Sequence, residues 1–533
     1  SQSRTGPWLL ALTYNEGGVL SGASNALYWT CGGFTDETVN VEYSTNLGLT
    51  WNFVADVAAT NGFYVWDVST NGPMACYWRV VCAADTNMWD RNDRQVAVSG
   101  GTVAYYVNDD STDGDVYCAG IGSRVPGAGL SSNVPLRELS EVIERYSPGA
   151  GAVIYVDTGG YTNPVVLRGN GSGSSTNGYL TIQGSTNRPA GGSVFTLNGG
   201  NGLDISGVSY LKVRNLGFRQ ARNGVFLRSG NAIRLEGIAC WSNSYAGFDV
   251  DTTYGLTMEG CVAAWNTSLG LIACQHAPAW RNGVLWENGA GLYAYTNHPV
   301  TISNSVIRQA SGKAFINVPG SAVGDYNVFD IGPGASFAGT SLPKLTDFQK
   351  EYNREWHSIS APADLSVTNW CDFHPRSETE RYDSLLGSWV TDAVHSACID
   401  LGDPALAVGE EPAPNGGRRN VGAYGGTAEA SQSRTGPWLL ALTYNEGGEL
   451  RLGNKTYWTA GNLGTNDTVR IELSLDGGTN WNVAASNVLA LQGYYTWTNS
   501  FSASSNALWR VVSSTNACIC GVVNSAFTYA NAP

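Results

Sequence analysis

The stretch GLDISGVSYLKVRNLGFRQARNGVFLRSGNAIRLEGIACWSNSYAGFDVD, residues 202–251, contains three glycine-led segments in which apolar and polar side chains alternate. The series continues beyond them, with segments that begin at Gly202, Gly224, Gly247, Gly270, Gly291 and Ala314, at spacings of 22, 23, 23, 21 and 23 residues. Short strands repeated at this period, without helical 3.6 periodicity, are typical of a parallel β-helix. The pattern therefore predicts a right-handed parallel β-helix with coils of 21–23 residues.

Two further series repeat in step with these segments. One is a series of side-chain amides, which stacked coils would place within hydrogen-bonding reach of one another as a buried ladder. The amides are Gln220, Asn243, Asn266, Asn288 and Gln309. The other is an apolar series expected to fill the interior, namely Leu203, Val225, Phe248, Leu271, Leu292 and Phe315.

The two ends of the chain are copies of one module. The string SQSRTGPWLLALTYNEGG occupies residues 1–18 and recurs unchanged at residues 431–448. Beyond it the copies correspond loosely, and each shows short alternating strands separated by turns, which is typical of a β-sandwich. The predicted fold is all-β, with a central β-helix at 101–427, including an N-terminal cap and a C-terminal exit region, between homologous sandwiches at 1–100 and 428–533.

Several motifs carry family resemblances. AYYVNDDSTDGD (104–115), DYNVFD (325–330) and NGGRRNVGAYGGT (415–427) resemble secreted bacterial right-handed parallel β-helix repeat proteins of the pectate-lyase-like superfamily. VEYSTNLGLTWNFVA (41–55) and IELSLDGGTNWNVAA (471–485) resemble Ig-like or fibronectin-III-like modules. The first resemblance implies the fold but leaves the function open, because that branch includes polysaccharide lyases, hydrolases, adhesins and members with no assigned activity.

The outward positions of the glycine-led segments form a candidate sugar-binding groove. The catalytic candidates are Arg228, Asp249, Asp251 and His276, and the carbohydrate-binding candidates are Tyr293 and Tyr295. In the alternative interpretation, Arg228 and Asp251 are ion partners in adjacent coils and the tyrosines cover the sheet. A second set has the same two interpretations, a catalytic carboxylate pair or an ion ladder, and consists of Arg214, Glu236, Glu259 and Arg281.

The segment NDDSTDGD (108–115) resembles the opening of an acidic calcium loop. Its candidate calcium ligands are Asp109, Ser111, Asp113 and Asp115. Gly120 stands where the loop's bidentate Glu is expected, so the alternative interpretation is an Asp-rich turn that caps the β-helix. Calcium is thus the one possible cofactor.

Eleven cysteines leave at least one thiol without a partner inside the chain. Cys31 is expected to pair with either Cys76 or Cys82, and Cys371 with Cys398, in disulfides. Cys240 and Cys261 are expected to fill the interior of the coils as free thiols.

A net charge of −14 argues against nucleic acid or an anionic membrane as partner, and no apolar run is long enough to span a bilayer. The favoured function is that of a secreted or cell-surface structural or adhesive protein without enzymatic activity. It would be a repeat unit of an extracellular filament, a surface layer or a giant repetitive surface protein that assembles head-to-tail. The alternative is a polysaccharide lyase, a glycoside hydrolase or a carbohydrate-binding protein acting on an acidic polysaccharide.

The identity of residues 1–18 and 431–448 has two explanations. Recent recombination could have copied the segment. Alternatively, the segment makes the same junction twice, once with its own β-helix and once with the β-helix of a neighbouring subunit.

Overall fold

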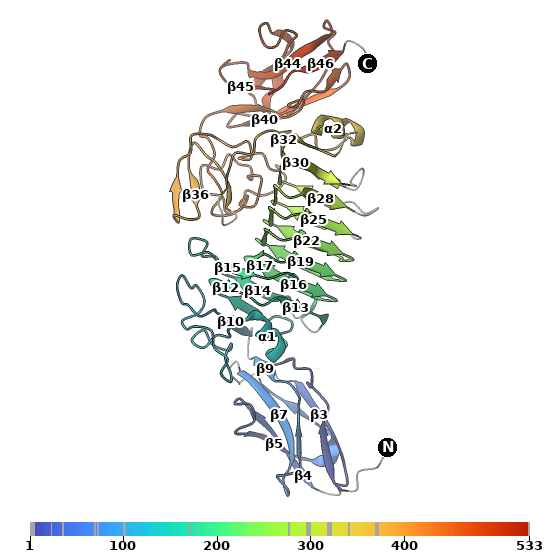
Figure 1. The fold of residues 1–533 in the computed structure, drawn as a ribbon, viewed down its shortest axis with the longest axis vertical. Helices are drawn as coiled ribbons and strands as arrows, with labels where there is room; N and C mark the ends of the chain where they lie inside the picture. Colours follow the sequence, from blue (N-terminus) through green and yellow to red (C-terminus); the bar gives the residue numbers. More distant parts are fainter. Residues whose placement is uncertain are drawn as a thin grey trace. The chain divides into compact units, whose positions relative to one another are not determined.

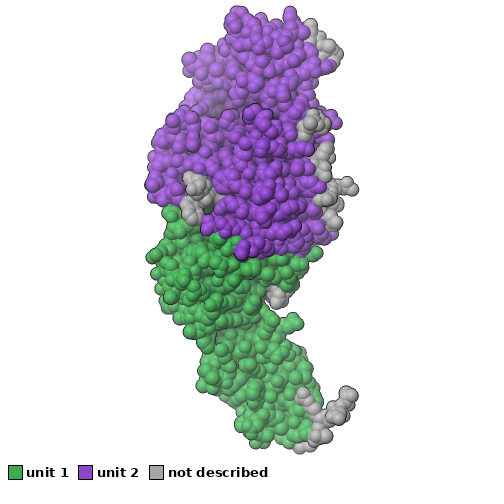
Figure 2. Space-filling view, viewed as in Figure 1, with its two compact units in different colours: residues 1–197, 202–217, 229–234 green, residues 198–201, 218–228, 235–533 purple. Residues whose placement is uncertain are grey.

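The computed structural model describes residues 6–22, 24–34, 37–68, 71, 74–99, 103–169, 172–176, 178–274, 278–294, 300–316, 322–338, 342–367 and 372–530. These residues are almost entirely strands and turns, with two short α-helices, α1 (Leu139–Tyr146) and α2 (Leu345–Tyr352). Figure 2 colours two compact units, residues 1–197, 202–217 and 229–234 in one and residues 198–201, 218–228 and 235–533 in the other. Among the described residues, no helix is long and apolar enough to cross a membrane.

The central region is a parallel β-helix, as predicted, with one strand of each sheet in successive coils (Figure 1). One sheet follows the order β10 (Ala104–Val107), β11 (Val153–Val156), β14 (Leu180–Gly184), β17 (Ser209–Arg214), β20 (Asn231–Glu236), β23 (Thr257–Glu259), β26 (Ala279–Arg281), β29 (Val300–Ser303) and β31 (Ala322–Asp325). Its strands pair in parallel and in register, for example at Glu259 and Arg281. Parallel pairing of successive strands is what a 21–23-residue coil predicts.

The other two faces of the β-helix join through one long bent strand, β30 (Val306–Ile316). One face contains β12 (Gly159–Tyr161), β15 (Ser193–Thr196), β18 (Leu216–Arg219), β21 (Ala239–Trp241), β24 (Val262–Ala264) and β27 (Val284–Trp286). The glycine-led face contains β13 (Val165–Leu167), β16 (Asn201–Ser206), β19 (Asn223–Arg228), β22 (Ala246–Asp251), β25 (Leu269–Cys274) and β28 (Ala290–Ala294). Strands β32 (Val328–Ser336) and β33 (Ile359–Ser360) continue from β30.

Close approach of the coils explains why the segments begin with glycine. A Cβ on Gly224 would lie 2.5 Å from Cys240 Sγ, and one on Gly247 would lie 2.8 Å from the Gly270 carbonyl oxygen. A Cβ on Gly270 would similarly lie 2.7 Å from the Gly291 carbonyl oxygen. No side chain fits at these positions, so the glycines permit the stacking. The predicted interior series is confirmed, because all six apolar residues from Leu203 to Phe315 are at most 1% exposed.

The predicted amide ladder is present over three coils. Asn243 Nδ2 donates to Asn266 Oδ1 (2.9 Å), and Asn266 Nδ2 donates to Asn288 Oδ1 (2.9 Å). The prediction was wrong for Gln220, which is exposed and has a left-handed φ of 58°. In that coil the ladder position is Ala221, whose backbone N–H donates to Asn243 Oδ1 (3.0 Å). Gln220 is therefore a turn residue one position out of the ladder.

The two end modules are sandwich-like pairs of sheets with the same strand topology. In the first, the small sheet is β1 (Trp8–Ala11), β3 (Asn25–Gly32) and β6 (Phe63–Trp66), and the larger one is β2 (Val19–Ser21), β9 (Val96–Ser99), β7 (Met74–Cys82), β4 (Thr38–Ser44) and β5 (Asn52–Ala58), with β8 (Trp89–Arg91) beside β7. In the second, the small sheet is β38 (Trp438–Ala441), β40 (Lys455–Gly461) and β43 (Tyr494–Thr496), and the larger one is β39 (Glu449–Arg451), β46 (Phe527–Ala530), β44 (Ser504–Ser513), β41 (Thr468–Ser474) and β42 (Asn482–Leu489), with β45 (Cys520–Val522) beside β44.

The predicted disulfide of the first sandwich is absent. Cys31, Cys76 and Cys82 are all free thiols. Cys76 is buried in the apolar core of the sandwich, and Cys31 Sγ instead donates a hydrogen bond to the Ala59 carbonyl (3.4 Å). These cysteines therefore act as small core residues, which is common for buried thiols.

The remaining predicted cysteines have different outcomes. Cys398 is a buried free thiol, so its predicted disulfide is also absent, while its expected partner Cys371 lies outside the described residues. Cys240 and Cys261 are fully buried free thiols inside the coils, as predicted.

Candidate functional site

The groove candidates of β19 and β22 form an ion cluster. Arg228 Nη2 donates to Asp249 Oδ1 (2.9 Å), and Arg228 Nε lies 3.8 Å from Asp251 Oδ2. The guanidinium also lies 4.0 Å from the centre of the Phe226 ring. In-register pairing places Phe226 opposite Asp249 and Arg228 opposite Asp251, which brings one cation between two carboxylates. This arrangement agrees with the alternative interpretation from the sequence, in which Arg228 and Asp251 are ion partners in adjacent coils.

The rest of the predicted groove is only partly described. Tyr293 of β28 is half-buried and pairs in register with Ile272 of the preceding coil. His276 and Tyr295 lie outside the described residues. Burial and the nearby Asp251 and Asp249 raise the pKa of the Cys274 thiol to about 11, so this cysteine is not an activated nucleophile.

In the predicted Arg–Glu–Glu–Arg series, Glu259 also forms an ion pair with Arg419 of the exit region. Glu259 Oε1 lies 3.3 Å from Arg419 Nη1, and Glu259 pairs in register with Arg281. Burial raises the pKa of Glu259, while Arg419 and Arg281 act against that rise and Glu236 adds to it. Glu259 therefore connects the coil to the exit region, which no local sequence pattern indicated.

The candidate calcium loop is a hydrogen-bonded turn. Asp109 accepts hydrogen bonds from the backbone N–H groups of Ser111 (2.8 Å) and Gly160 (2.8 Å), and Ser111 Oγ accepts one from the Asp113 N–H (3.0 Å). Burial, with the nearby Asp157, raises the pKa of Asp115 to about 6. Within the described part of the chain, no three His, Cys, Asp or Glu side chains are grouped so that they could hold a metal ion. The structure thus shows this segment as a hydrogen-bonded turn, and calcium binding there stays a prediction.

A residue that the sequence did not single out anchors this loop. Asp157 lies just after β11 and accepts hydrogen bonds from the backbone N–H groups of Val116 (2.7 Å), Tyr117 (2.7 Å) and Cys118 (2.6 Å). The loop is therefore a cap tied to the first coils through a buried carboxylate.

The repeated string forms an extensive junction in its second copy. Ser431 Oγ donates to the Pro375 carbonyl (2.5 Å), and the Gln432 N–H donates to the Glu380 carbonyl (2.8 Å). Ser433 Oγ donates to Asp400 Oδ1 (2.7 Å), a contact in which both groups are buried. All the partners belong to the exit region of the β-helix, within the same compact unit.

Helix α2 of the exit region contacts the end of the same string. Glu446 accepts a hydrogen bond from the Leu345 N–H (2.8 Å) at the first residue of the helix. Gly448 lies so close that a Cβ there would be 2.9 Å from Thr346 Cγ2. Arg434, near the start of the string, forms an ion pair with Glu378 (3.0 Å). Both ends of the string therefore contact the exit region.

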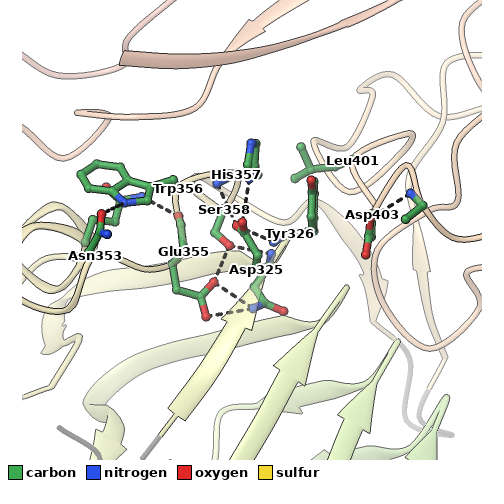
Figure 3. Close-up of polar contacts among 12 residues, drawn as sticks. Asp325, Tyr326, Asn353, Glu355, Trp356, His357, Ser358, Leu401 and Asp403 are labelled. Atoms are coloured by element: carbon green, nitrogen blue, oxygen red, sulfur yellow. Dashed lines mark hydrogen bonds and ion pairs between the residues drawn. The ribbon is translucent and has the colours of Figure 1, made fainter. Parts of the chain in front are cut away.

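An Asp–His pair in the exit region, drawn in Figure 3, contacts the second sandwich through neighbouring aromatic rings. Asp325, at the end of β31, accepts hydrogen bonds from the His357 backbone N–H (2.8 Å), and its other oxygen lies 2.6 Å from His357 Nδ1. The His357 ring stacks on Tyr326 with 4.9 Å between centroids, and its edge faces Tyr457 of the second sandwich. Trp356 also stacks on Tyr457 (5.5 Å). The pair thus orients aromatic rings at the sandwich contact.

Glu355 is buried beneath this pair (Figure 3). Its carboxyl group accepts hydrogen bonds from Asn327 Nδ2 (2.9 Å) and from Ser358 Oγ (2.5 Å). Burial, followed by the negative charge of Asp325, raises the pKa of Glu355 to about 8. The carboxyl group is therefore largely protonated at neutral pH.

The two copies of the string differ sharply in exposure. Leu12 is 49% exposed in the first sandwich, whereas its counterpart Leu442 is 2% exposed. Leu10 and Tyr28 are likewise exposed, whereas the corresponding residues of the second copy are half-buried. The strand pairing is the same in both copies, with Ala11 opposite Trp29 and Ala441 opposite Trp458. The pairing of the sandwich strands therefore does not explain the extra burial of the second copy, in which the string also contacts the exit region.

A comparison with protein-family models agrees with the β-helix. Residues 153–328 match a family model described as the right handed beta helix region. The crystal structure of pectate lyase Pel9A aligns at 15% identity and a TM-score of 0.34, covering 61% of this chain and 97% of that one. None of the curated proteins compared matches the sequence.

Proposed function

We propose that this chain is a structural unit of a repetitive cell-surface or extracellular assembly, in which sandwich modules join successive β-helices. The observation that carries the proposal is the difference between Leu12 and Leu442, which have identical surroundings in sequence but are 49% and 2% exposed. When an apolar surface is exposed in one copy of a module and buried in the other copy, we expect a similar partner to cover the exposed one. The proposed partner of the first sandwich is therefore the exit region of another copy.

The first sandwich also has a neighbour inside its own compact unit, the N-terminal cap of the β-helix. In the first copy, Gln95 is only 4% exposed, and the loop around it shares a 330 Å³ pocket with Arg124, Glu144 and Arg145 of the N-terminal cap. The corresponding residue of the second copy, Ala526, is exposed. The two copies use the same part of the sandwich here. A Cβ on Gly17 would lie 3.0 Å from Ser147 Cβ and 3.3 Å from the Gln95 carbonyl oxygen, whereas one on the equivalent Gly447 would lie 2.9 Å from the Ala526 carbonyl oxygen and 3.3 Å from Lys344 Nζ. The cap therefore contacts in the first copy a part of the surface that the exit region contacts in the second.

This arrangement also accounts for the unchanged 18-residue string. The hydrogen bonds of Ser431, Gln432 and Ser433 involve both backbone and side-chain atoms, and Glu446 binds the helix start. A junction with so many specific contacts restricts substitution at most positions. Residues that face only their own sandwich core are free to change to similar apolar residues, as the copies do elsewhere.

The proposal is tested in the full chain by releasing the C-terminal sandwich from its exit region. Leu442→Asp places a carboxylate in the buried junction, and hydrogen exchange over residues 431–442 reports the release. The freed exit region is expected to bind the first sandwich of another chain, so sedimentation velocity should show concentration-dependent oligomers. The double variant Leu12→Asp/Leu442→Asp is expected to remain monomeric. A released but monomeric Leu442→Asp protein, or equal association of the double variant, contradicts the proposal.

The enzymatic alternative depends on the glycine-led face. There Arg228 is bound to Asp249 and lies near Asp251, and such an ion cluster has a sufficient structural role in holding coils together. We therefore assign this face to stacking. Release of unsaturated oligosaccharides from polygalacturonate, measured by ultraviolet absorbance, would instead support a lyase, and its loss in Arg228→Ala would locate the activity.

A further inference from the structure

A pocket of about 580 Å³ lies between helix α2 and the β39–β40 connection of the second sandwich, inside one compact unit. Its walls come from the end of α2 and the following turn on one side and, on the other, from β39, β40 and the turn that joins them. The lining residues used below are Lys350, Trp356, Glu449, Arg451, Lys455 and Tyr457. Asn353 and Asn454 add side-chain amides to the wall. The pocket is separate from the glycine-led groove and from the junction contacts of residues 431–434.

Aromatic rings are held in place on one side of the pocket. Trp356 and Tyr457 stack at 5.5 Å with an interplanar angle of 23°. Trp356 Nε1 donates to Asn353 Oδ1 (2.9 Å), which fixes the orientation of the indole. Rigid aromatic faces combined with a few polar groups are typical of sites for small ring-shaped ligands, including sugars. Asn353 and Asn454 can form hydrogen bonds with hydroxyl groups.

The pocket is positively charged in a strongly acidic chain. Lys350, Arg451 and Lys455 line it together with a single carboxylate, Glu449, whereas the whole chain has a net charge of −14. Glu449 forms an ion pair with Arg451 (2.9 Å), so the lysines supply the excess charge. Two of the five lysines of the sequence lie here. Such a local concentration of cations favours an anionic ligand.

The first sandwich lacks these charges at the same positions. Two equivalent asparagines fix the alignment. Asn25 accepts a hydrogen bond from the Ser21 backbone N–H (2.8 Å), and Asn454 accepts one from the Arg451 backbone N–H (3.0 Å). Arg451 thus corresponds to Ser21, and Lys455 corresponds to Ala26. The cations appear only in the copy that has α2 beside it. The sandwich fold therefore does not require these cations, and we connect them with the pocket.

We propose that this pocket binds an anionic saccharide, with a sugar ring against Trp356 or Tyr457 and its carboxylate or sulfate group near Lys455 and Lys350. The inference goes beyond the structural role proposed above and does not depend on it. A saccharide bound here would connect the protein to a surrounding acidic glycan without any turnover. The carboxylated and sulfated sources share the required chemistry and are separated by the test.

Isothermal titration calorimetry of the full chain tests the site with hexagalacturonic acid, a chondroitin sulfate hexasaccharide and uncharged cellohexaose. At least one anionic probe is expected to bind, with an affinity that falls as salt is raised, and cellohexaose is expected to bind at least tenfold more weakly. The identity of the tighter anionic probe decides between carboxylate and sulfate. Equal binding of cellohexaose and both anionic probes, or no binding of any probe, would overturn the inference.

Variants place the binding in this pocket. Arg451→Ser/Lys455→Ala introduces the residues of the first copy and is expected to weaken anionic binding at least tenfold without changing the unfolding temperature. The matched control, Lys313→Ala, removes an exposed lysine of β30 outside the pocket and should bind as the wild type does. Trp356→Phe, which keeps an aromatic ring, should retain more affinity than Trp356→Ala. Unchanged binding in Arg451→Ser/Lys455→Ala would refute this location.

Discussion

Replacement of Asn266 by alanine tests the amide ladder at its best-connected member. Asn266 Oδ1 accepts hydrogen bonds from the backbone N–H (3.1 Å) and the side-chain amide (2.9 Å) of Asn243. Asn266 Nδ2 donates to the Cys240 carbonyl (3.0 Å) and to Asn288 Oδ1 (2.9 Å). The amide of Asn266 is 1% exposed, so water cannot replace these partners without opening the coil.

The magnitude follows from the groups that lose a partner. After Asn266→Ala, the Asn243 backbone N–H and the Cys240 carbonyl have lost their hydrogen bonds to the Asn266 side chain. Two other groups keep a partner: Asn243 Nδ2 lies 3.4 Å from the Phe218 carbonyl, and Asn288 Oδ1 still accepts from the backbone N–H of residue 266. Each unsatisfied buried group costs about 1–3 kcal/mol, so the expected total is about 4 kcal/mol. At 1.4 kcal/mol per factor of ten, local opening becomes about a thousandfold more frequent.

Hydrogen exchange measured by mass spectrometry is the suitable assay, because a chain with several modules does not unfold in one two-state step. Amides of β22 and β25 should lose about a thousandfold in protection, while those of the second sandwich should not change. The matched control is Asn231→Ala, which changes an exposed asparagine of β20. Protection in Asn266→Ala within tenfold of that control would refute the ladder as a source of stability.

Three further outcomes are expected. Burial and the charge of Asp325 raise the pKa of Glu355 to about 8, so between pH 4.5 and 8 the folded state binds one proton more than the unfolded state. Thermal stability should therefore fall as pH rises through this window, and it should fall less in Glu355→Gln. Chelation of calcium should leave the melting temperature unchanged, because Asp109 is already bound by backbone N–H groups; a drop after chelation would restore the calcium interpretation. Arg228→Ala should lower the hydrogen-exchange protection of β19 and β22 by about 3 kcal/mol, because it leaves the buried Asp249 without its cation, and Asp249→Asn in the same chain should recover part of that loss.

The coil pattern was predictable because the β-helix is a local repeat. Each coil contacts mainly the next one, so the spacing of Gly224, Gly247 and Gly270 in sequence becomes their stacking in space. The error at Gln220 has the same origin, since an amide one position out of register occupies the turn and not the ladder. Sequence spacing alone does not resolve a one-residue shift when adjacent coils differ in length.

The sites were less predictable because they depend on distant segments. The sequence indicated that Arg228 and Asp251 belong to adjacent coils, and in-register pairing gives them that relation. No local pattern connects Glu259 with Arg419, or Asp325 with His357, because these pairs come from separate parts of the chain. The available signals near these contacts were the motifs DYNVFD, which begins at Asp325, and NGGRRNVGAYGGT, which contains Arg419.

The sequence by itself determined the architecture of this protein: an all-β chain, a parallel β-helix of 21–23-residue coils and two copies of one sandwich module. It did so because period, glycine spacing and buried side chains are properties of neighbouring coils and strands. Only the tertiary structure decided that identical residues have different surroundings, with Leu12 exposed and Leu442 buried. The physical reason is that burial depends on what packs against a surface, and contacts such as that of Leu345 with Glu446 join residues 101 positions apart in the sequence.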